Sequence, residues 1–410
     1  MTPDIDAVAA EMERASETSG LWLMIVLGTL LAFASISTDL YLPAMPAMSV
    51  ALAASQGTLQ YTVSGYLIGF SVGQLFWGPI ADRYGRRIPI AIGLVLFMAG
   101  SAGCALSTNV VQLISCRVLQ AVGACASVVL ARAMVRDLYG RDRSAGVLST
   151  LMTVMAVAPL LGPSIGGLIL KVAPWQAIFW TLVLIGFLTL AALFTLSETL
   201  PRERRNAEPL SAAFAAYGSL IGDVRLLGYA GAVGFFYAAV FAGISSSSFA
   251  YINYHHLSPQ LYGLVFAVGT IGLMVTNFAN SRLVTRFGGD CMLKLGTTGA
   301  AVSGAILAFV TATDFGGVLG MALSLWLFTA MNGFVTANAI SGALADFPMR
   351  AGAVSALMGA IQYGSGVVGS AIAGTFADGT PRPMGWVIAI AGIGSLGCAH
   401  LVGRRSRQYG

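Results

Sequence analysis

Two charged residues, Asp39 and Arg117, lie inside long apolar stretches of this 410-residue chain. Asp39 lies 18 residues into a run that begins at residue 21, or about 27 Å along a helix rising about 1.5 Å per residue. Arg117 lies at a comparable depth in a run that begins near 109. An ionised side chain inside a bilayer costs several kcal/mol unless it is paired or hydrated. Both residues are therefore candidates for function, and we expect them to be near neighbours, directly or through water.

The chemistry that this pair could perform is proton transfer. Loss of water disfavours the charged form of a carboxyl group, whereas a nearby cation favours it. Small movements of Asp39 relative to Arg117 could therefore load or release a proton. The competing interpretation is a permanent ion pair that only braces the helices.

A charged loop after the second apolar run is a further candidate. It combines one acid with three bases and two glycines: Gly78, Asp82, Arg83, Gly85, Arg86 and Arg87. Glycine permits a tight turn, and an acid can pair with a helix end. As a charge cluster alone, the loop indicates only which side of a membrane it faces.

The fifth apolar run contains several helix-distorting residues: Pro159, Gly162, Pro163, Gly166 and Gly167. Proline and glycine let helices bend and approach one another closely. The segment predicts either a packing kink or a seal against leakage along that helix.

Aromatic and amide side chains could line a cavity for an amphiphilic molecule. Tyr66, Phe70 and Gln74 recur at a spacing of four and so share a helical face. The full set of candidates is Tyr41, Tyr61, Tyr66, Phe70, Gln74, Phe236, Asn332 and Gln362. For any single ring, packing against lipid or the core is the competing interpretation.

The composition identifies the kind of elements that hold these residues. Apolar residues make up 57% of the chain and charged residues only 10%, against about 25% charged in a soluble domain. This disfavours a soluble enzyme or a nucleic-acid-binding protein. The five cysteines lie in or beside apolar stretches, which suggests neither a disulfide framework nor a metal site. With a single buried acid and no paired intramembrane histidines, we expect no enzyme activity and no cofactor.

Twelve apolar runs are long enough to cross a bilayer core of roughly 30 Å. They cover residues 21–43, 57–80, 88–107, 109–131, 145–172, 175–197, 224–251, 260–281, 291–312, 316–344, 351–376 and 384–403. The sequence therefore predicts an all-α integral membrane protein with twelve transmembrane helices.

The chain divides into two similar halves. Residues 145–152 and 351–358 share the pattern A-G-x-x-S-x-L-M, and Arg83-Tyr-Gly85 has an echo in Arg286-Phe-Gly288. We predict a tail over 1–20, six-helix bundles over 21–197 and 224–403, a linker over 198–223 and a tail over 404–410. Two pseudo-symmetric six-helix bundles are a transporter architecture, with the substrate site expected between them.

The basic residues predict the orientation. Of 22 lysines and arginines, 19 fall on the side of the two tails and the linker, and only Lys171 and Arg382 fall on the other. The positive-inside rule then places both termini and the linker in the cytoplasm. This distribution also explains the net charge of +5 without a nucleic-acid partner.

Several of these motifs together resemble the major facilitator superfamily. The 78–87 loop resembles its signature G-x-x-x-D-R-x-G-R-R, and Leu113, Arg117, Gln120 and Gly123 resemble its fourth-helix motif, with Ala121 in place of the usual first glycine. The proline–glycine run resembles the antiporter motif of drug:proton antiporters. Residues 37–46, 136–139, 175–179 and 198–201 resemble the Bcr/CflA branch of bicyclomycin and chloramphenicol-type exporters.

The resemblance implies a major facilitator fold and a function. The expected function is proton-coupled efflux of amphiphilic drugs, such as bicyclomycin or phenicols, across a bacterial inner membrane. Asp39 would be the proton site and Arg117 its modulator. The expected partners are small-molecule drugs, protons and the lipid bilayer, the proton motive force is the energy source, and the protein is expected to be a monomer. The alternative is a proton-coupled importer of a small nutrient.

Overall fold

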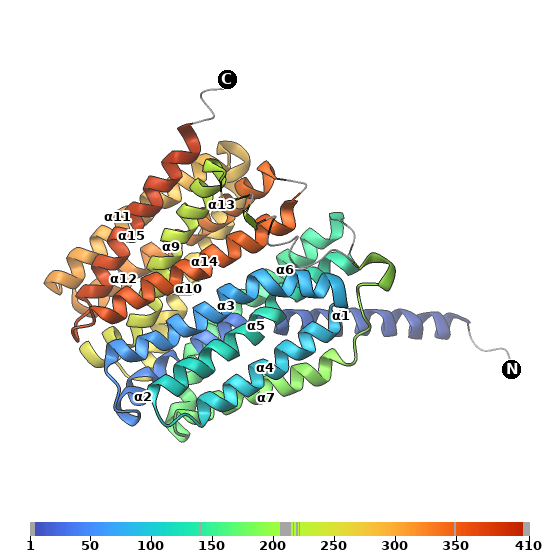
Figure 1. Ribbon diagram of the computed structural model, residues 1–410, viewed down its shortest axis with the longest axis horizontal. Coiled ribbons are helices and arrows are strands. Elements are labelled where there is room, and N and C mark those ends of the chain that lie inside the picture. Colours follow the sequence, from blue (N-terminus) through green and yellow to red (C-terminus); the bar gives the residue numbers. More distant parts are fainter. Residues whose placement is uncertain are drawn as a thin grey trace.

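In the computed structural model, every regular element of the described residues is helical (Figure 1). The structure describes residues 5–139, 141–205, 215, 217, 218, 220, 222–347 and 350–404, without the side chains of 5–19, 141–146, 148, 149, 152–156, 403 and 404. Much of the expected linker and the tail from 405 thus lie outside the described residues.

The helices of the N-terminal half are α1 (Ile5–Asp39), η1 (Leu42–Ala44), α2 (Met45–Ala51), α3 (Gln56–Tyr84), α4 (Arg87–Ala105), α5 (Val110–Leu138), α6 (Arg141–Val172) and α7 (Gln176–Leu193). The short turn η2 (Arg202–Arg204) follows. The C-terminal half contains α9 (Val224–Ser248), η3 (Phe249–Tyr254), α10 (Pro259–Phe287), α11 (Gly289–Thr313), α12 (Gly317–Ala330), α13 (Asn332–Asp346), α14 (Ala351–Thr375) and α15 (Arg382–Arg404).

Within the described residues, ten helical segments are long and apolar enough to cross a membrane. Three of these segments combine neighbouring elements: α1 with α2, α9 with η3, and α12 with α13. The other two expected spans are α3, whose buried face carries Gln60, Ser64 and Gln74, and α6, whose apolar part is Val157–Val172. With these two, the fold has the twelve spans that the sequence predicts.

The two sequence echoes occupy equivalent places in the two halves. Residues 145–152 lie at the start of α6, the fifth span of one half, and residues 351–358 lie at the start of α14, the fifth span of the other. Gly85 and Gly288 each end the second span of their half, with φ of 93° and 81°. Such left-handed backbone favours glycine. The duplication visible in the sequence is therefore also a duplication of local structure.

The halves pack through their second and fifth spans. α3 packs against α14, and α6 packs against α10, so each half contributes the same two helices to the seam (Figure 1). Among the described residues, six neutral hydrogen bonds cross the seam: Tyr61–Thr375 at 2.9 Å, Ser64–Ser370 at 2.7 Å, Ser71 to the Ala360 carbonyl at 2.8 Å, Ser246–Gln60 at 3.1 Å, Ser248 to the Met45 sulfur at 3.6 Å and Gln260 to the Gly167 carbonyl at 2.8 Å.

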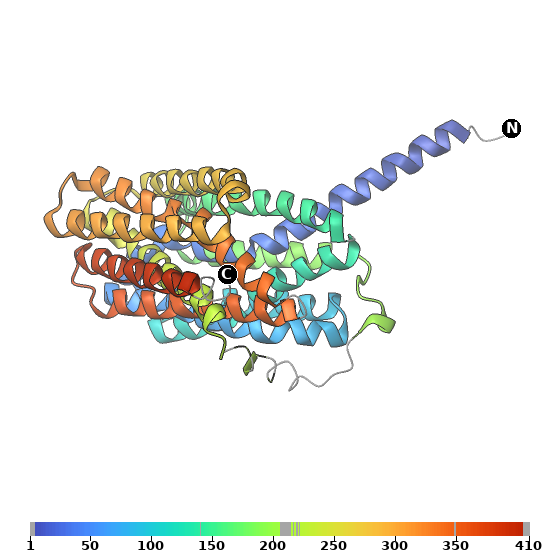
Figure 2. The same cartoon turned by 90° about the horizontal axis from the view of Figure 1, so that it is seen from above.

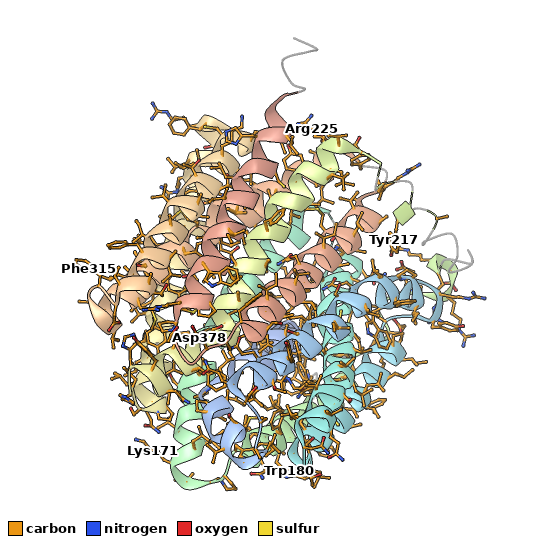
Figure 3. All side chains as sticks on the ribbon, turned by 60° about the vertical axis from the view of Figure 1, so that its left-hand side comes forward. Lys171, Trp180, Tyr217, Arg225, Phe315 and Asp378 are labelled. Atoms are coloured by element: carbon orange, nitrogen blue, oxygen red, sulfur yellow. The ribbon has the colours of Figure 1, made fainter. Side chains whose placement is uncertain are left out.

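The molecule has two distinct ends. Tyr217 and Arg225 mark one end, which we call the basic end, whereas Lys171 and Asp378 mark the opposite or far end (Figure 3). α1 extends past the other helices toward the N-terminus (Figure 2). At the far end the halves are in contact, because Gly57 meets Gly374 and Gly167 meets Pro259.

Candidate functional site

Asp39 is the last residue of α1, and its side chain is only 4% exposed. The Thr38 hydroxyl donates a hydrogen bond to its carboxylate at 3.1 Å. The proline–glycine segment of α6 lies directly against this turn. A Cβ added at Gly162 would lie 2.9 Å from the Asp39 Cβ, and one added at Gly166 would overlap the Leu40 carbonyl. Glycine is therefore required here so that α6 can approach the turn that carries Asp39.

Gly167, the neighbour of Gly166, faces the other half of the molecule. A Cβ added there would lie 2.8 Å from the Pro259 carbonyl oxygen of α10. The segment thus has two contact surfaces, one toward α1 within its own half and one across the seam. Contacts of both kinds are compatible with either interpretation of the sequence, so the kink and the seal both stay predictions.

Arg117 on α5 is completely buried. Its Nη1 donates to the Ser37 carbonyl at 3.0 Å and to the Gln120 side chain at 2.5 Å. The guanidinium carbon lies 4.2 Å from the ring centroid of Tyr41 and 4.4 Å from that of Tyr66. A desolvated cation between two aromatic faces gains about 2 kcal/mol or more from each. Arg117 is therefore held by rings and neutral oxygens.

Asp39 and Arg117 contact the same turn of α1 without forming an ion pair. Arg117 binds Ser37 and stacks on Tyr41, the residues two before and two after Asp39. Of the five ion pairs among the described side chains, none includes Asp39 or Arg117. The carboxyl can thus bind or release a proton without first breaking a salt bridge.

The expected loop over residues 78–87 is mostly helical: Gly78, Asp82 and Arg83 lie in the last turns of α3, α4 begins at Arg87, and only Gly85 and Arg86 lie between the two helices. The segment is folded around Arg86. This side chain binds Asp82 at 2.6 Å and Asp137, near the end of α5, at 2.8 Å. Gly85 makes the turn with φ of 93°. Arg87 donates to the Phe194 carbonyl at 2.7 Å, just beyond the end of α7. The loop therefore ties together the basic ends of α3, α4, α5 and α7.

Glu198 closes this network from the segment after α7. Its carboxylate accepts hydrogen bonds from the backbone N–H groups of Arg86 at 2.8 Å, Arg87 at 3.1 Å and Leu200 at 3.0 Å. Partial burial acts to raise the pKa of Glu198, but these donors and the charge of Arg205 outweigh it and lower the pKa. A side chain at Gly85 would meet this carboxylate, with Cβ 2.6 Å from Oε2.

Sequence reasoning missed the roles of Asp137 and Glu198. Both lie in short segments, at 136–139 and 198–201, that were noted only for their family resemblance. The available signal was that each segment places an acid just after an apolar run, on the same side as the 78–87 loop.

A second charge cluster at the basic end belongs to the C-terminal half. Arg225, at the start of α9, lies 3.1 Å from Asp346 and 3.9 Å from Asp290 (Figure 3 labels Arg225). The Tyr229 hydroxyl donates to Asp290 at 2.6 Å. As at Arg86, one arginine lies between two acids, but here the arginine comes from the first span of its half. The echo at 286–288 alone could not reveal this exchange.

Several predicted cavity residues meet at the seam. The ring centroid of Phe70 on α3 lies 4.3 Å from that of Tyr363 on α14 and 6.0 Å from that of Tyr66. Gln74, one turn further along α3, faces Gly359. This aromatic group therefore connects the surroundings of Arg117 to the C-terminal half.

Other predicted cavity residues lie elsewhere. Tyr61 forms its hydrogen bond with Thr375 toward the far end of the seam. Phe236 stacks on Phe328 with centroids 5.2 Å apart, inside the C-terminal half. Asn332 accepts a hydrogen bond from Thr336 on its own helix. Gln362 is half-buried on α14. No group of three metal-ligating side chains occurs in the part of the chain that the structure describes.

The fold and the charged loop define a class of membrane transporter, and comparison with known proteins gives its family. Residues 25–370 match the Major Facilitator Superfamily, to which this chain belongs. It is a multi-pass membrane transporter and not an enzyme.

Two relatives and one solved structure locate the chain within that family. It is 34% identical to the uncharacterized MFS-type transporter YdgK of Bacillus subtilis, over 95% of this chain and 97% of that protein. It is 30% identical to the bicyclomycin resistance protein homolog of Haemophilus influenzae, over 88% of this chain and 91% of the relative. The xylose transporter XylE from E. coli, in a partially occluded inward-open conformation, has a TM-score of 0.72 at 15% identity and covers 92% of this chain and 96% of its own. That likeness concerns the fold alone, whereas the relatives connect the chain to drug-resistance proteins.

Proposed function

We propose that this protein exports amphiphilic drugs in exchange for protons, with Asp39 as the proton-carrying group. The observation that carries the proposal is the position of Asp39: a buried acid with no ion-pair partner among the described side chains, on a turn that α6 contacts through Gly162. The similarity to a bicyclomycin resistance protein homolog supports drugs as the substrate class.

The two surfaces of the α6 segment suggest how proton binding is coupled to transport. Gly162 contacts the Asp39 turn, and Gly167 contacts the opposite half. Protonation of Asp39 would change how α1 and α6 pack, and α6 would transmit that change to α10 across the seam. Arg117 would act as a positioning residue, because it holds the turn from Ser37 to Tyr41.

The orientation follows from the charge distribution. We propose that the basic end faces the cytoplasm of a bacterial cell and the far end faces the periplasm, because nearly all the arginines lie on the side of the basic end. A proton entering from the far end then moves down the membrane potential, which supplies about 2.3 kcal/mol per 100 mV. The 78–87 loop would act as a gate between the two access states, and the seam aromatics would contact the drug.

The test is transport in proteoliposomes with an imposed pH gradient. A panel of bicyclomycin, phenicols and lipophilic cations identifies the substrate, and the direction of its movement distinguishes export from nutrient import. Asp39→Asn should abolish substrate-induced proton release while the protein still folds, because a neutral amide costs less to bury than a charge. The matched control is Asp378→Asn at the exposed far end, which should leave release unchanged. An Asp39→Asn protein that still concentrates drug against its gradient would refute the proposal.

A further inference from the structure

An apolar cleft of 440 Å³ opens at the far end, beside the seam. Its walls come from both halves and include Pro43, Ala47, Leu170, Trp175, Ile252 and Pro259. All nine lining residues are proline, alanine, leucine, isoleucine or tryptophan. Its volume falls in the range of about 300–1,000 Å³ that small-molecule sites occupy.

The cleft has rigid walls. Four of its lining residues are prolines, whose backbone φ is fixed. The Trp175 ring packs edge-on against Phe179, with centroids 6.1 Å apart and an interplanar angle of 89°. Toward the membrane centre, Gly166 lies against Leu40 and Pro43. Neither Gly162 nor Asp39 lines the cleft, so it is a different site from the Gly162–Asp39 contact.

The lining chemistry favours a hydrocarbon chain over a drug. Sites for drug-like molecules place a few polar groups to orient the ligand, and the only polar side-chain group in this lining is the indole N–H of Trp175. An acyl chain requires none. The helices that border the cleft also present exposed apolar side chains below it, among them Ile165 and Leu168 of α6 and Leu261 and Leu264 of α10. Two of the helices that line the cleft, α6 and α10, thus also carry apolar side chains exposed to lipid.

A cation lies where a lipid headgroup would be. Lys171, beside the lining residue Leu170, is exposed in the last turn of α6 at the far end (Figure 3). Among the described residues it has neither an ion pair nor a hydrogen bond through its side chain. The sequence places just one other basic residue on this side, Arg382. A phosphate would complement the Lys171 charge while its chain occupied the cleft.

We propose that this cleft binds the acyl chain of a phospholipid from the far-end leaflet, with the lipid phosphate beside Lys171. Because the walls belong to both halves, the bound chain would fill the join between α6 and α10 while the far end is closed.

Tryptophan quenching by brominated lipid tests the proposal on the full-length protein. Two variants each keep one tryptophan, Trp175 in the cleft or Trp180 on the outer surface of α7, and replace the other five by phenylalanine. Trp175 is 6% exposed and Trp180 is 47% exposed, so bulk lipid alone should quench only Trp180. Lipid in the cleft should quench both. Quenching of Trp180 without Trp175 would overturn the proposal.

Two substitutions test the parts of the site separately. Ala47→Phe should fill the cleft and remove the quenching of Trp175 while leaving that of Trp180. Lys171→Gln should lower the preference of the cleft for brominated phosphatidylglycerol over phosphatidylcholine by about fivefold, which corresponds to about 1 kcal/mol per lysine near an anionic surface. Arg382→Gln is the matched control and should not change this lipid preference.

Other occupants give different results. A Trp175 that brominated lipid does not reach, but that a nitroaromatic phenicol quenches, would identify a drug exit site and refute the lipid assignment. Quenching that Ala47→Phe leaves intact would place the lipid outside the cleft and would also refute it. An unchanged lipid preference in Lys171→Gln would refute the placement of a phosphate with net negative headgroup charge beside Lys171.

Discussion

Replacing Gly167 by alanine should shift the protein toward a state that is open at the far end. The added Cβ would lie 2.8 Å from the Pro259 carbonyl oxygen, 0.6 Å less than the 3.4 Å at which ordinary contacts begin. The obstacle is backbone, so it cannot rotate away. Overpacking of this kind costs about 1–3 kcal/mol. The higher helix propensity of alanine benefits both states equally, because α6 is helical in each.

The expected shift follows from that cost. Since the contact crosses the seam, it penalises only the state in which the far end is closed. A penalty of about 2 kcal/mol changes the ratio of closed to open molecules by about 30-fold, given about 1.4 kcal/mol per factor of ten. Spin labels at Leu106 and Phe315, exposed far-end positions in opposite halves, should then show a longer distance by double electron–electron resonance.

Two other glycines provide the controls. Gly269→Ala on α10 should leave the distance unchanged, because a Cβ there meets nothing within 4 Å. Gly69→Ala would make a Cβ overlap the Val118 carbonyl oxygen of α5, within the same half, so it should lower thermal stability without favouring either state. The reasoning would be refuted if Gly167→Ala kept the wild-type distance distribution, or if Gly69→Ala produced the same opening.

Three further predictions concern the loop, the topology and Arg117. Glu198→Gln should lose about 1–2 kcal/mol of stability at pH 7, since hydrogen bonds to a charged group are weakened. Because the pKa of Glu198 is lowered in the folded protein, this contribution should persist down to pH 5 and vanish as the pH falls through that pKa. The unfolding temperatures of variant and wild type should therefore become equal at low pH. A difference that stays constant with pH would contradict the stabilising role of the Glu198 carboxylate. In a cysteine-free chain, Asp314→Cys and Asp378→Cys should react with an impermeant thiol reagent in intact cells and Asn206→Cys should not, whereas the reverse pattern would invert the orientation. Arg117→Lys should reduce drug-induced proton release by about tenfold or more, because the ammonium group loses the planar stacking on two rings, and unchanged release would show that charge alone matters.

The sequence predicts much of the fold because the bilayer requires long apolar helices. The limits of the spans follow from where polar residues interrupt the apolar runs, as at Asn109, which caps α5. The equivalent turns at Gly85 and Gly288 were visible as an echo for the same local reason. Partners distant along the chain were less accessible. Glu198 binds Arg86 across 112 residues, and no periodicity indicates which loop a single acid will reach.

For the candidate site too, local features could be predicted from the sequence and contacts between distant residues could not. Asp39 and Arg117 could be identified from the sequence because charge is rare inside apolar runs. That they would share one turn of α1 without an ion pair depends on the rings of Tyr41 and Tyr66, which offer the cation a substitute for a carboxylate. Aromatic residues are common in membrane helices, so Phe236, which packs on Phe328 inside one half, could not be distinguished from Phe70 at the seam.

The neutral seam has a consequence for how the protein responds to its surroundings. All six hydrogen bonds described across it join hydroxyl, amide, carbonyl or thioether groups, and each ion pair of the described residues stays within one half. Added salt screens charges but leaves such contacts nearly unaffected. The balance between the open and closed far end should therefore be almost independent of ionic strength. The same protein could then work in cells that grow in dilute or in saline media, without substitutions that adjust the balance between its two states.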